Sequence, residues 1–520
     1  MITKTCFFIS NGYLVLKTTF MRKFCVLILS CMSFTCLFAQ NKKQHLQEKI
    51  TAFDSYVQSA MQVWQVPGMS LAIVKDGEIV FTKGYGVTQL GIDKKVDTKT
   101  YFTCASTTKA MTAVCMGILA DEGKVKWNDP VIKYLPDFKL YDPLVTKELV
   151  IQDLFTHNTG VGNADYLWVD NILSEDEVLA KMQLVKPSYS LRSSFVYQNI
   201  FYLGAGKIIE KISGKPWSVF IKENIFDKLG MQHTKALYKQ LDSDNRATPH
   251  EMINGQVTIV EKESADVIGP AGSVGSCADD IALWMKCMID SSKYNGGRLV
   301  KPEIWMYLLK PKTLVPEDEY YPTQLITKPN FTTYAMGWFQ QDYKGYKLNF
   351  HTGSLEGETA IHAQLPDKKF GIYVFGNLDH AELRHALVFK AIDLFELGGN
   401  MDWSSAFKHL YDSLHTERRK ADSINLPVQA ANTKPSLPLQ HYTGTYSDEL
   451  YGSVNIVSEN NQLKVIINTV RKGDLTHFHY DTFKAVYPKK ENSPDYYTFQ
   501  INSHGKVNAV SVNGITYNRK

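Results

Sequence analysis

The sequence predicts an α+β fold: an antiparallel sheet flanked by helices, a large helical subdomain, and a small all-β domain at the C-terminus. Strand-like alternation occurs at 68–82 and returns only after residue 330, with mainly helical patterns between. Strands and helices that do not alternate along the chain favour an antiparallel sheet. Short strands then resume after residue 441, and a chain of 520 residues exceeds one ordinary core.

The elements of the larger domain follow in order. An amphipathic helix is expected over 45–66, because apolar residues recur there at three- and four-residue steps. A hairpin follows, and then a mainly helical stretch from about 100 to 310 that Gly- and Pro-containing loops interrupt. Two early strands and about four late ones should form one sheet. Their ranges, with a closing helix last, are 68–74, 79–82, 334–341, 347–352, 358–365, 370–376 and 381–397.

Residues 1–39 have the pattern of a secretory signal peptide. A basic start at Met21 precedes an apolar stretch over 24–38, and Ala39 offers a cleavage point. The apolar stretch is short for a membrane span, and the alternatives are an uncleaved anchor or a lipoprotein attached at Cys31. We therefore expect an exported protein, periplasmic or secreted.

Charge and cysteine content give no indication of a nucleic-acid partner or of a metal site built from cysteines. The leader holds four of the 57 basic residues and no acidic one, which leaves 53 basic against 53 acidic residues. This balance gives no reason to expect a nucleic-acid partner. The four cysteines after the leader lack metal-ligand spacing, and we expect buried thiols: Cys104, Cys115, Cys277 and Cys287.

Ser106-Thr-Thr-Lys109 is the pattern that indicates chemistry. Residues three apart share a helix face, so the amine can reach the hydroxyl and take its proton. A helix N-terminus also favours developing negative charge. The same spacing occurs at Ser405–Lys408 and Ser503–Lys506, but only Ser106 precedes an apolar pattern, over 110–120, typical of a buried helix. The alternative is a serine that merely caps this helix.

A second pattern, Tyr197-Gln-Asn199, supplies partners for the serine and lysine. A tyrosine beside such a pair can move a proton between nucleophile and leaving group, and a nearby Lys109 would lower its pKa. Asn199 would hold Lys109 and a substrate amide through its carboxamide. The alternative is a turn with an aromatic plug.

A third pattern ends a strand-like run with His351, Thr352, Gly353 and Ser354. A glycine at that place allows a substrate to approach the strand backbone closely. The N–H of Ser354 would then be the second oxyanion-hole donor beside that of Ser106. The alternative is a strand that simply leaves into a turn.

In this order the three patterns resemble the motifs of the serine β-lactamase and penicillin-binding protein superfamily, over about 45–400. The second motif, with its tyrosine, resembles that of the class C-like branch. This branch includes D-alanyl-D-alanine carboxypeptidases, D-aminopeptidases, amidases and esterases. The resemblance implies a β-lactamase/transpeptidase-like fold in which Ser106 is acylated, Lys109 is its base partner and Tyr197 the general acid/base. Asn199 and the 351–354 strand would bind substrate.

The same resemblance implies acyl transfer through an acyl-enzyme, followed by hydrolysis. It implies a small-molecule or peptide substrate, and neither a metal, an organic cofactor nor a stable protein partner is inferred. The lactamases of this branch usually carry lysine where His351 stands, and histidine is largely neutral at pH 7. We therefore expect a hydrolase of a small amide or ester related to D-amino-acid peptides. A true class C-like β-lactamase and a penicillin-type sensor that acylates without turnover are the alternatives.

The expected organisation has four parts: a signal peptide (1–39), the hydrolase domain (45–400), a helix and Pro-containing linker (401–440), and a small β-barrel or sandwich (441–520). The last part resembles the small barrel appended to many members of this superfamily. It would cap the cleft, bind a cell-wall or peptide ligand, or add stability. We favour the structural role.

Overall fold

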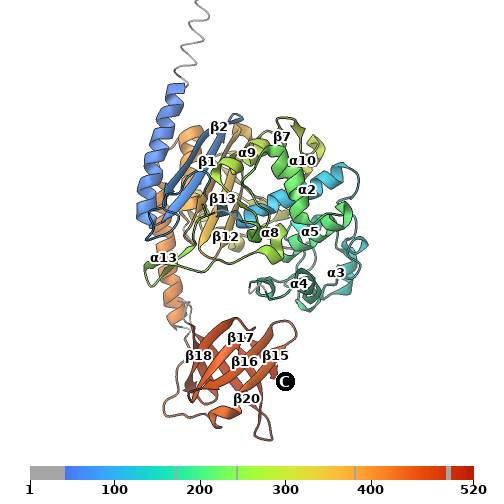
Figure 1. Cartoon of the computed structure of the whole chain (residues 1–520), viewed down its shortest axis with the longest axis vertical. Coiled ribbons are helices and arrows are strands. Elements are labelled where there is room, and N and C mark those ends of the chain that lie inside the picture. The colour runs from blue at the N-terminus through green and yellow to red at the C-terminus, as the bar shows by residue number, and fades with distance from the viewer. Residues whose placement is uncertain are drawn as a thin grey trace, which may run out of the picture.

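The computed structural model describes residues 41, 43–169, 172–241, 244–379, 382–424, 426–487 and 494–520. The predicted signal peptide, with Cys31, lies outside the described residues. Within the described part, no helix combines the length and apolar character needed to cross a membrane. Figure 1 shows a larger domain and a C-terminal barrel, joined through α13 (Trp403–Ile424).

As predicted, an antiparallel sheet forms the centre of the larger domain, and it has eight strands. The early hairpin is completed by strands from the end of the domain, because β1 pairs with β14 through Leu71 and Val374. Six late strands take part, where about four were expected. The spatial order is β2 (Glu78–Gly86), β1 (Gly68–Lys75), β14 (Phe370–Gly376), β13 (Glu358–Leu365), β12 (Tyr346–Leu355), β11 (Phe339–Tyr343), β10 (Thr332–Tyr334) and β9 (Thr313–Leu314).

Both faces of this sheet are covered, which explains why its central strands are apolar throughout. Along β1, Leu71 and Ile73 join one hydrophobic core, whereas Ala72 and Val74 join the other. Successive side chains of a strand point to opposite faces, so a strand between two helical layers needs apolar residues at every position.

The expected strand over 334–341 is wrong in its continuity, because the chain turns between β10 and β11. Gly337 adopts a φ of 82°, and a Cβ at this position would lie 2.6 Å from the backbone nitrogen of Ala110. The turn therefore packs directly on the start of α2 (Thr108–Asp121). Sequence periodicity carries no information on a contact between segments more than 200 residues apart.

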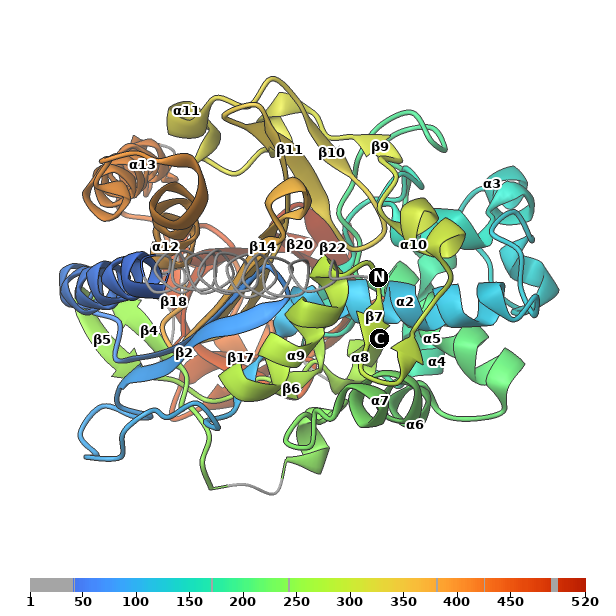
Figure 2. The ribbon, with the colours of Figure 1, turned by 90° about the horizontal axis from the view of Figure 1, so that it is seen from above.

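A helical subdomain lies on one side of the sheet, and α2 runs through its centre (Figure 2). Residues 108–119 of α2 are all buried, as its apolar sequence predicts. The other helices of this side are α3 (Pro143–Glu148), α4 (Glu175–Lys181), α5 (Ile200–Ser213), α6 (Trp217–Ile221), α7 (Asp227–Leu229), α8 (Gly269–Gly272), α9 (Ala278–Ile289) and α10 (Pro302–Leu308), whereas α11 (Gln324–Thr327) lies near α13 in Figure 2 and packs Ile326 on the other core.

Short strands and single helical turns connect these helices. Two of the turns matter for the site, η1 (Ala105–Thr107) and η4 (Asp165–Leu167). The short strands are β3 (Phe102–Thr103) with β6 (Gly275–Ser276), β4 (His250–Ile253) with β5 (Gln256–Ile259), and β7 (Lys293–Tyr294) with β8 (Gly297–Arg298).

The opposite face of the sheet is covered by three helices that lie together in Figure 2. They are the helix over 43–64, α12 (Leu383–Ile392) and α13. The first turns of α13 are buried through Trp403 and Phe407, and the rest of this helix is largely exposed. The cysteines at 104, 115, 277 and 287 are all buried and free, as expected.

The C-terminal domain is a closed antiparallel barrel of eight strands. It closes because β15 also pairs with β22 through Tyr446 and Arg519. The last two strands are joined by the Asn513-Gly514 turn, whose φ values of 51° and 78° are typical of a tight hairpin. The strands are β15 (Gly444–Asp448), β16 (Gly452–Glu459), β17 (Gln462–Ile467), β18 (Arg471–His479), β19 (Thr482–Val486), β20 (Asp495–Ile501), β21 (Val507–Val512) and β22 (Ile515–Arg519).

The barrel touches the helical subdomain through the turn between β15 and β16, which we call the barrel turn (residues 448–451). Leu450 packs against the core of the larger domain. Lys181 Nζ donates a hydrogen bond to the carbonyl of Glu449, and the ring of Tyr451 lies 4.7 Å from that of Tyr166. The barrel therefore contacts η4, which lies beside the site described next.

Candidate active site

The three sequence patterns meet at one cavity of about 440 Å³. Ser106 lies in η1, directly before α2, and Tyr197 and Asn199 directly precede α5. Thr352 and Ser354 belong to β12. These five side chains line the cavity together, although they come from segments far apart in the sequence.

Lys109 is fully buried and makes three hydrogen bonds. Its Nζ lies 3.0 Å from Ser106 Oγ, 2.7 Å from Asn199 Oδ1 and 2.9 Å from the carbonyl of Ala271. Burial lowers the pKa of this amine from 10.5 to about 7, while the charge of Asp165 raises it in part. A substantial neutral fraction therefore exists near pH 7, as a base for Ser106 requires.

Asp165, which sequence reasoning missed, lies behind Asn199. Its Oδ1 accepts hydrogen bonds from Asn199 Nδ2 at 2.9 Å and from Trp168 Nε1 at 2.7 Å. A polar chain thus runs from Asp165 through Asn199 and Lys109 to Ser106. Asp165 occupies a loop without periodicity, so no local pattern distinguished it from other loop acids.

Tyr197 keeps its proton at neutral pH. Burial raises its pKa well above 10, and the hydrogen bond with the Ser106 hydroxyl offsets this effect in part. The expectation that Lys109 would lower the tyrosine pKa is therefore wrong, although Nζ lies 5.0 Å from the ring centroid. A protonated phenol beside the nucleophile can donate a proton to a leaving group.

Gly353 brings β12 directly against the nucleophile turn. A Cβ at this position would lie 2.3 Å from the carbonyl oxygen of Cys104 and 3.0 Å from the nitrogen of Ser106. Ala105, between them, adopts a φ of 45°, which residues with a Cβ rarely adopt. The glycine thus allows two protein segments to pack closely, whereas we had expected it to allow a substrate to approach the strand.

His351 lies outside the cavity lining, with 1% of its surface exposed. Its Nε2 lies 2.9 Å from Tyr334 Oη, and its Nδ1 lies 2.6 Å from the carbonyl of Thr352. Burial, assisted by the charge of Lys109, lowers its pKa to about 3, so the ring is neutral. In this arrangement the residue supports the strand behind the site and supplies no cation to a substrate.

His157 is a further residue that sequence reasoning did not select. It is buried, its ring centroid lies 4.2 Å from that of Tyr197, and its Nδ1 accepts a hydrogen bond from Gln198 N at 3.1 Å. Burial keeps its pKa well below 6.5. A neutral ring that packs against that of Tyr197, tilted by 33°, helps to fix the position of the phenol.

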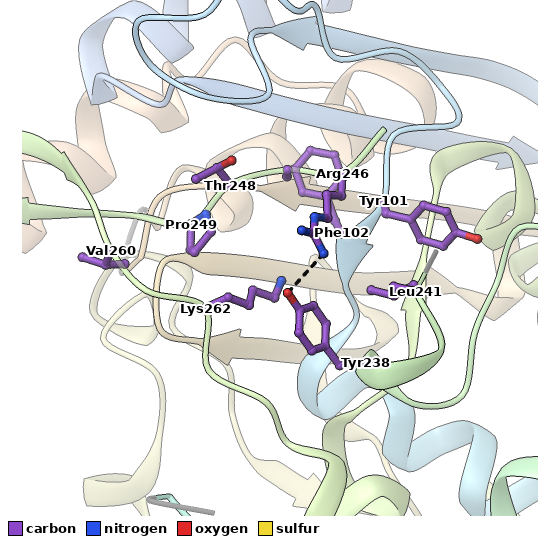
Figure 3. Close-up of a pocket in the computed structure, with 10 residues that line it drawn as sticks. Tyr101, Phe102, Tyr238, Leu241, Arg246, Thr248, Pro249, Val260 and Lys262 are labelled. Atoms are coloured by element: carbon purple, nitrogen blue, oxygen red, sulfur yellow. Dashed lines mark hydrogen bonds between the residues drawn. The ribbon is translucent and has the colours of Figure 1, made fainter. Parts of the chain in front are cut away.

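A second, smaller cavity of about 170 Å³ is drawn in Figure 3, and its lining residue Lys262 directly precedes Glu263, which lines the larger cavity. Figure 3 shows Arg246 and Lys262 converging on Tyr238, with 3.5 Å between Arg246 Nη1 and the tyrosine hydroxyl. Lys262 forms an ion pair with Glu358 and donates to Thr103 Oγ1 at 2.7 Å. These contacts fix the segment that continues into the wall of the larger cavity. Among the described residues no cluster of three or more potential metal ligands occurs.

A serine hydrogen-bonded to a buried lysine, beside a protonated tyrosine, defines a class of serine hydrolases on this α+β fold. The chain belongs to the beta-lactamase family, because the model of that family matches residues 53–395. A second model, described as a domain of unknown function (DUF3471), matches residues 428–519, which include the barrel.

Curated relatives and solved structures are similar to this chain over much of its length. An unguisins hydrolase (ungD) of Aspergillus violaceofuscus is 26% identical over 438 residues, which cover 78% of this chain and 76% of that protein. The protein flp of Staphylococcus aureus is 26% identical and covers 63% of this chain and 62% of its own length.

Two solved structures show the same fold at low identity. An octameric penicillin-binding protein homologue from Pyrococcus abyssi covers 90% of this chain and 99% of its own, with a TM-score of 0.60 and 20% identity. A D-stereospecific amidohydrolase from Streptomyces sp. covers 66% and 99%, with a TM-score of 0.54 and 18% identity.

Proposed function

We propose that this protein hydrolyses a small amide or ester, related to D-amino-acid peptides, through an acyl-enzyme on Ser106. The observation that carries the proposal is the contact of 3.0 Å between Lys109 Nζ and Ser106 Oγ, inside a cavity. The neutral amine takes the hydroxyl proton while the oxygen attacks the carbonyl carbon of the substrate. The N–H groups of Ser106 and Ser354 are the proposed donors to the oxyanion.

The second half of the reaction follows from the state of Tyr197. The protonated phenol donates its proton to the leaving amine or alcohol, and the proton taken up by Lys109 replaces it. Water then hydrolyses the ester on Ser106, with Tyr197 and Lys109 moving protons in the reverse direction. Asn199 accepts from Lys109 at 2.7 Å and keeps the amine aimed at the serine.

The charge of the cavity favours amine-bearing or neutral substrates over substrates with a carboxylate. Asp165, Glu263, Glu356 and Asp379 line it, and none of the described lining residues is lysine or arginine. The Arg384 guanidinium, which donates to Ser354 Oγ at 2.9 Å, is already paired with Glu382, so a carboxylate in this lining meets mainly like charges. This argues against penicillins and peptides with a free C-terminus, as does the neutral His351. The name of one structural neighbour, a D-stereospecific amidohydrolase, supports an amide substrate, and the name of one relative, an unguisins hydrolase, supports hydrolysis.

The first experiment identifies the nucleophile with a fluorophosphonate probe. The probe should label the wild-type protein and fail to label Ser106→Ala. The matched control is Ser405→Ala, which removes the exposed serine of another S-x-x-K match on α13 and should keep full labelling. Labelling of Ser106→Ala at the wild-type rate would overturn the proposal.

The second experiment separates hydrolysis from sensing and from lactamase activity. Turnover is measured with p-nitroanilides of D-alanine, free or succinylated at the amine, and with nitrocefin. We expect the free amine to react at least tenfold faster than the succinylated form, and nitrocefin to react slowly. Stoichiometric acylation that persists without turnover would identify a sensor, and fast nitrocefin turnover would identify a β-lactamase.

We also propose that the protein is exported, and the leader pattern over 1–39 supports this. Fractionation of expressing cells, with N-terminal sequencing of the mature protein, tests it. A chain retained in the cytoplasm with its first residues intact would contradict it.

A further inference from the structure

We propose that the barrel turn holds η4 in place, and that the barrel is thereby a positioning element of the active site. The inference rests on the proposed function, because it concerns the base that activates Ser106. It gives a role to the domain that has no assigned function, and its premise is a set of contacts from Tyr451 in the barrel to Lys109.

The first step is the stiffness of the barrel turn. Asp448 Oδ1 accepts hydrogen bonds from the backbone nitrogens of Leu450 at 2.8 Å and Tyr451 at 2.9 Å. The following Gly452 has a φ of 86°, and Asn468 Oδ1 accepts from Ser453 N at 2.9 Å. The turn is therefore shaped by contacts inside the barrel, before any contact with the larger domain.

The second step is the contact across the domains. The rings of Tyr451 and Tyr166 lie 4.7 Å apart at an angle of 40°. Leu450 packs on the core of the larger domain, and Lys181 donates to the carbonyl of Glu449. An aromatic contact flanked by an apolar contact and a hydrogen bond fixes the position of one segment against the other.

The third step links Tyr166 to the base. Tyr166 follows Asp165 within the single turn η4, so a movement of one residue moves the other. Asp165 bonds Asn199 at 2.9 Å, and Asn199 bonds Lys109 at 2.7 Å. On the inner side, Trp168 Nε1 anchors Asp165 at 2.7 Å. The turn is thus held by the larger domain on one side and by the barrel on the other.

The consequence is that loosening the barrel contact displaces Asp165 from Asn199. Asn199 then loses the acceptor that orients its amide, and the amine is aimed less well at Ser106. Tyr451→Ala should reduce kcat/KM for a neutral p-nitrophenyl ester about five- to tenfold. It should also move the acidic limb of the pH–rate profile in the same direction as Asp165→Asn, which a loss of general stability would not do.

The experiment compares Tyr451→Ala and Asp165→Asn, alone and combined, with two control variants of the full-length protein. Tyr451→Phe keeps the ring and removes only the hydroxyl that hydrogen-bonds Tyr166, so it should keep most of the wild-type rate. Tyr480→Ala removes an exposed tyrosine from another barrel turn and should have no effect. In the Asp165→Asn background, Tyr451→Ala should cause no further change in the pH limb, because both act through one carboxylate.

A wild-type rate and pH limb in folded Tyr451→Ala would overturn the inference, as would an equal effect of this substitution with and without Asp165. If Tyr451→Ala does not fold, Tyr166→Ala tests the same contact from the other side. Hydrogen exchange of residues 163–168 gives a readout independent of activity, and it should rise in Tyr451→Ala. Failure of the proposed function would instead show as absence of fluorophosphonate labelling in the wild-type protein.

Discussion

Replacing Asp165 by asparagine should move the activity of this protein to lower pH. Asp165 is connected to Lys109 through the amide of Asn199, with hydrogen bonds of 2.9 Å and 2.7 Å. Its charge raises the pKa of the amine, against the larger effect of burial, to give the value of about 7. Asparagine keeps the oxygen that accepts from Asn199 and removes the charge.

The size of the shift follows from the distance between the charges. Across one amide group the carboxylate and the amine are about 8 Å apart, and their attraction at an effective dielectric constant of about 20 is about 2 kcal/mol. This corresponds to about 1.5 pH units. The pKa of Lys109 should therefore fall from about 7 to about 5.5, where the first value is that of the native site.

The sign of the effect makes the prediction specific. The neutral amine is the active base, so a lower pKa populates it at lower pH. The acidic limb of the kcat/KM profile therefore shifts to lower pH. The plateau at high pH should fall modestly, because a less basic amine is a weaker general base. His351 does not interfere, since its pKa is about 3.

The assay is the pH dependence of kcat/KM between pH 5 and 9 for a neutral p-nitrophenyl ester at constant ionic strength. The control is Asp137→Asn, which removes an exposed charge from the helical subdomain. A limb that stays near pH 7 in Asp165→Asn, or moves upward, would refute the assignment of Lys109 as the titrating base under the influence of Asp165.

Three other predictions concern the supports of the site. Gly353→Ala places a methyl group 2.3 Å from a carbonyl oxygen of the nucleophile turn. We expect kcat/KM for the ester to fall at least a hundredfold, and the free energy of unfolding in urea to fall by about 1–3 kcal/mol. Lys262→Met leaves the buried Glu358 without its cation and should lower the unfolding free energy by about 3 kcal/mol. Adding Glu358→Gln should restore part of the lost unfolding free energy. If the losses of the two substitutions add instead, the pairing of Lys262 with Glu358 is contradicted. His362 is buried with its pKa lowered to about 3, so the unfolded chain binds the proton more readily below about pH 6.5. Protonation of this histidine in the unfolded chain should lower the unfolding free energy by about 1.4 kcal/mol per pH unit as the pH drops toward 3. Urea midpoints that do not differ between wild type and His362→Phe below pH 6 would contradict this prediction.

The sequence was informative wherever function or structure depends on neighbours along the chain. Local patterns of this kind are the spacing of Ser106 and Lys109, the apolar run of α2 and the early hairpin. The sheet and the barrel were likewise predicted from strand-like alternation within short segments. The roles of these side chains in catalysis remain predictions that the labelling experiment tests.

What could not be predicted depends on contacts between distant segments. Asp165 matters because a loop brings it to Asn199, and the split between β10 and β11 depends on Gly337 packing against Ala110. The pKa of Tyr197 could not be predicted in direction either, since burial outweighs the nearby cation only in the folded molecule.

The pairing of β1 with β14 has a consequence for how the chain matures. Leu71 pairs with Val374, so the sheet closes only after roughly 300 further residues have been made. A chain emerging from the ribosome carries the nucleophile turn long before it carries β12, the strand that supports it. Such a chain stays without its complete central sheet until the larger domain is almost fully synthesised.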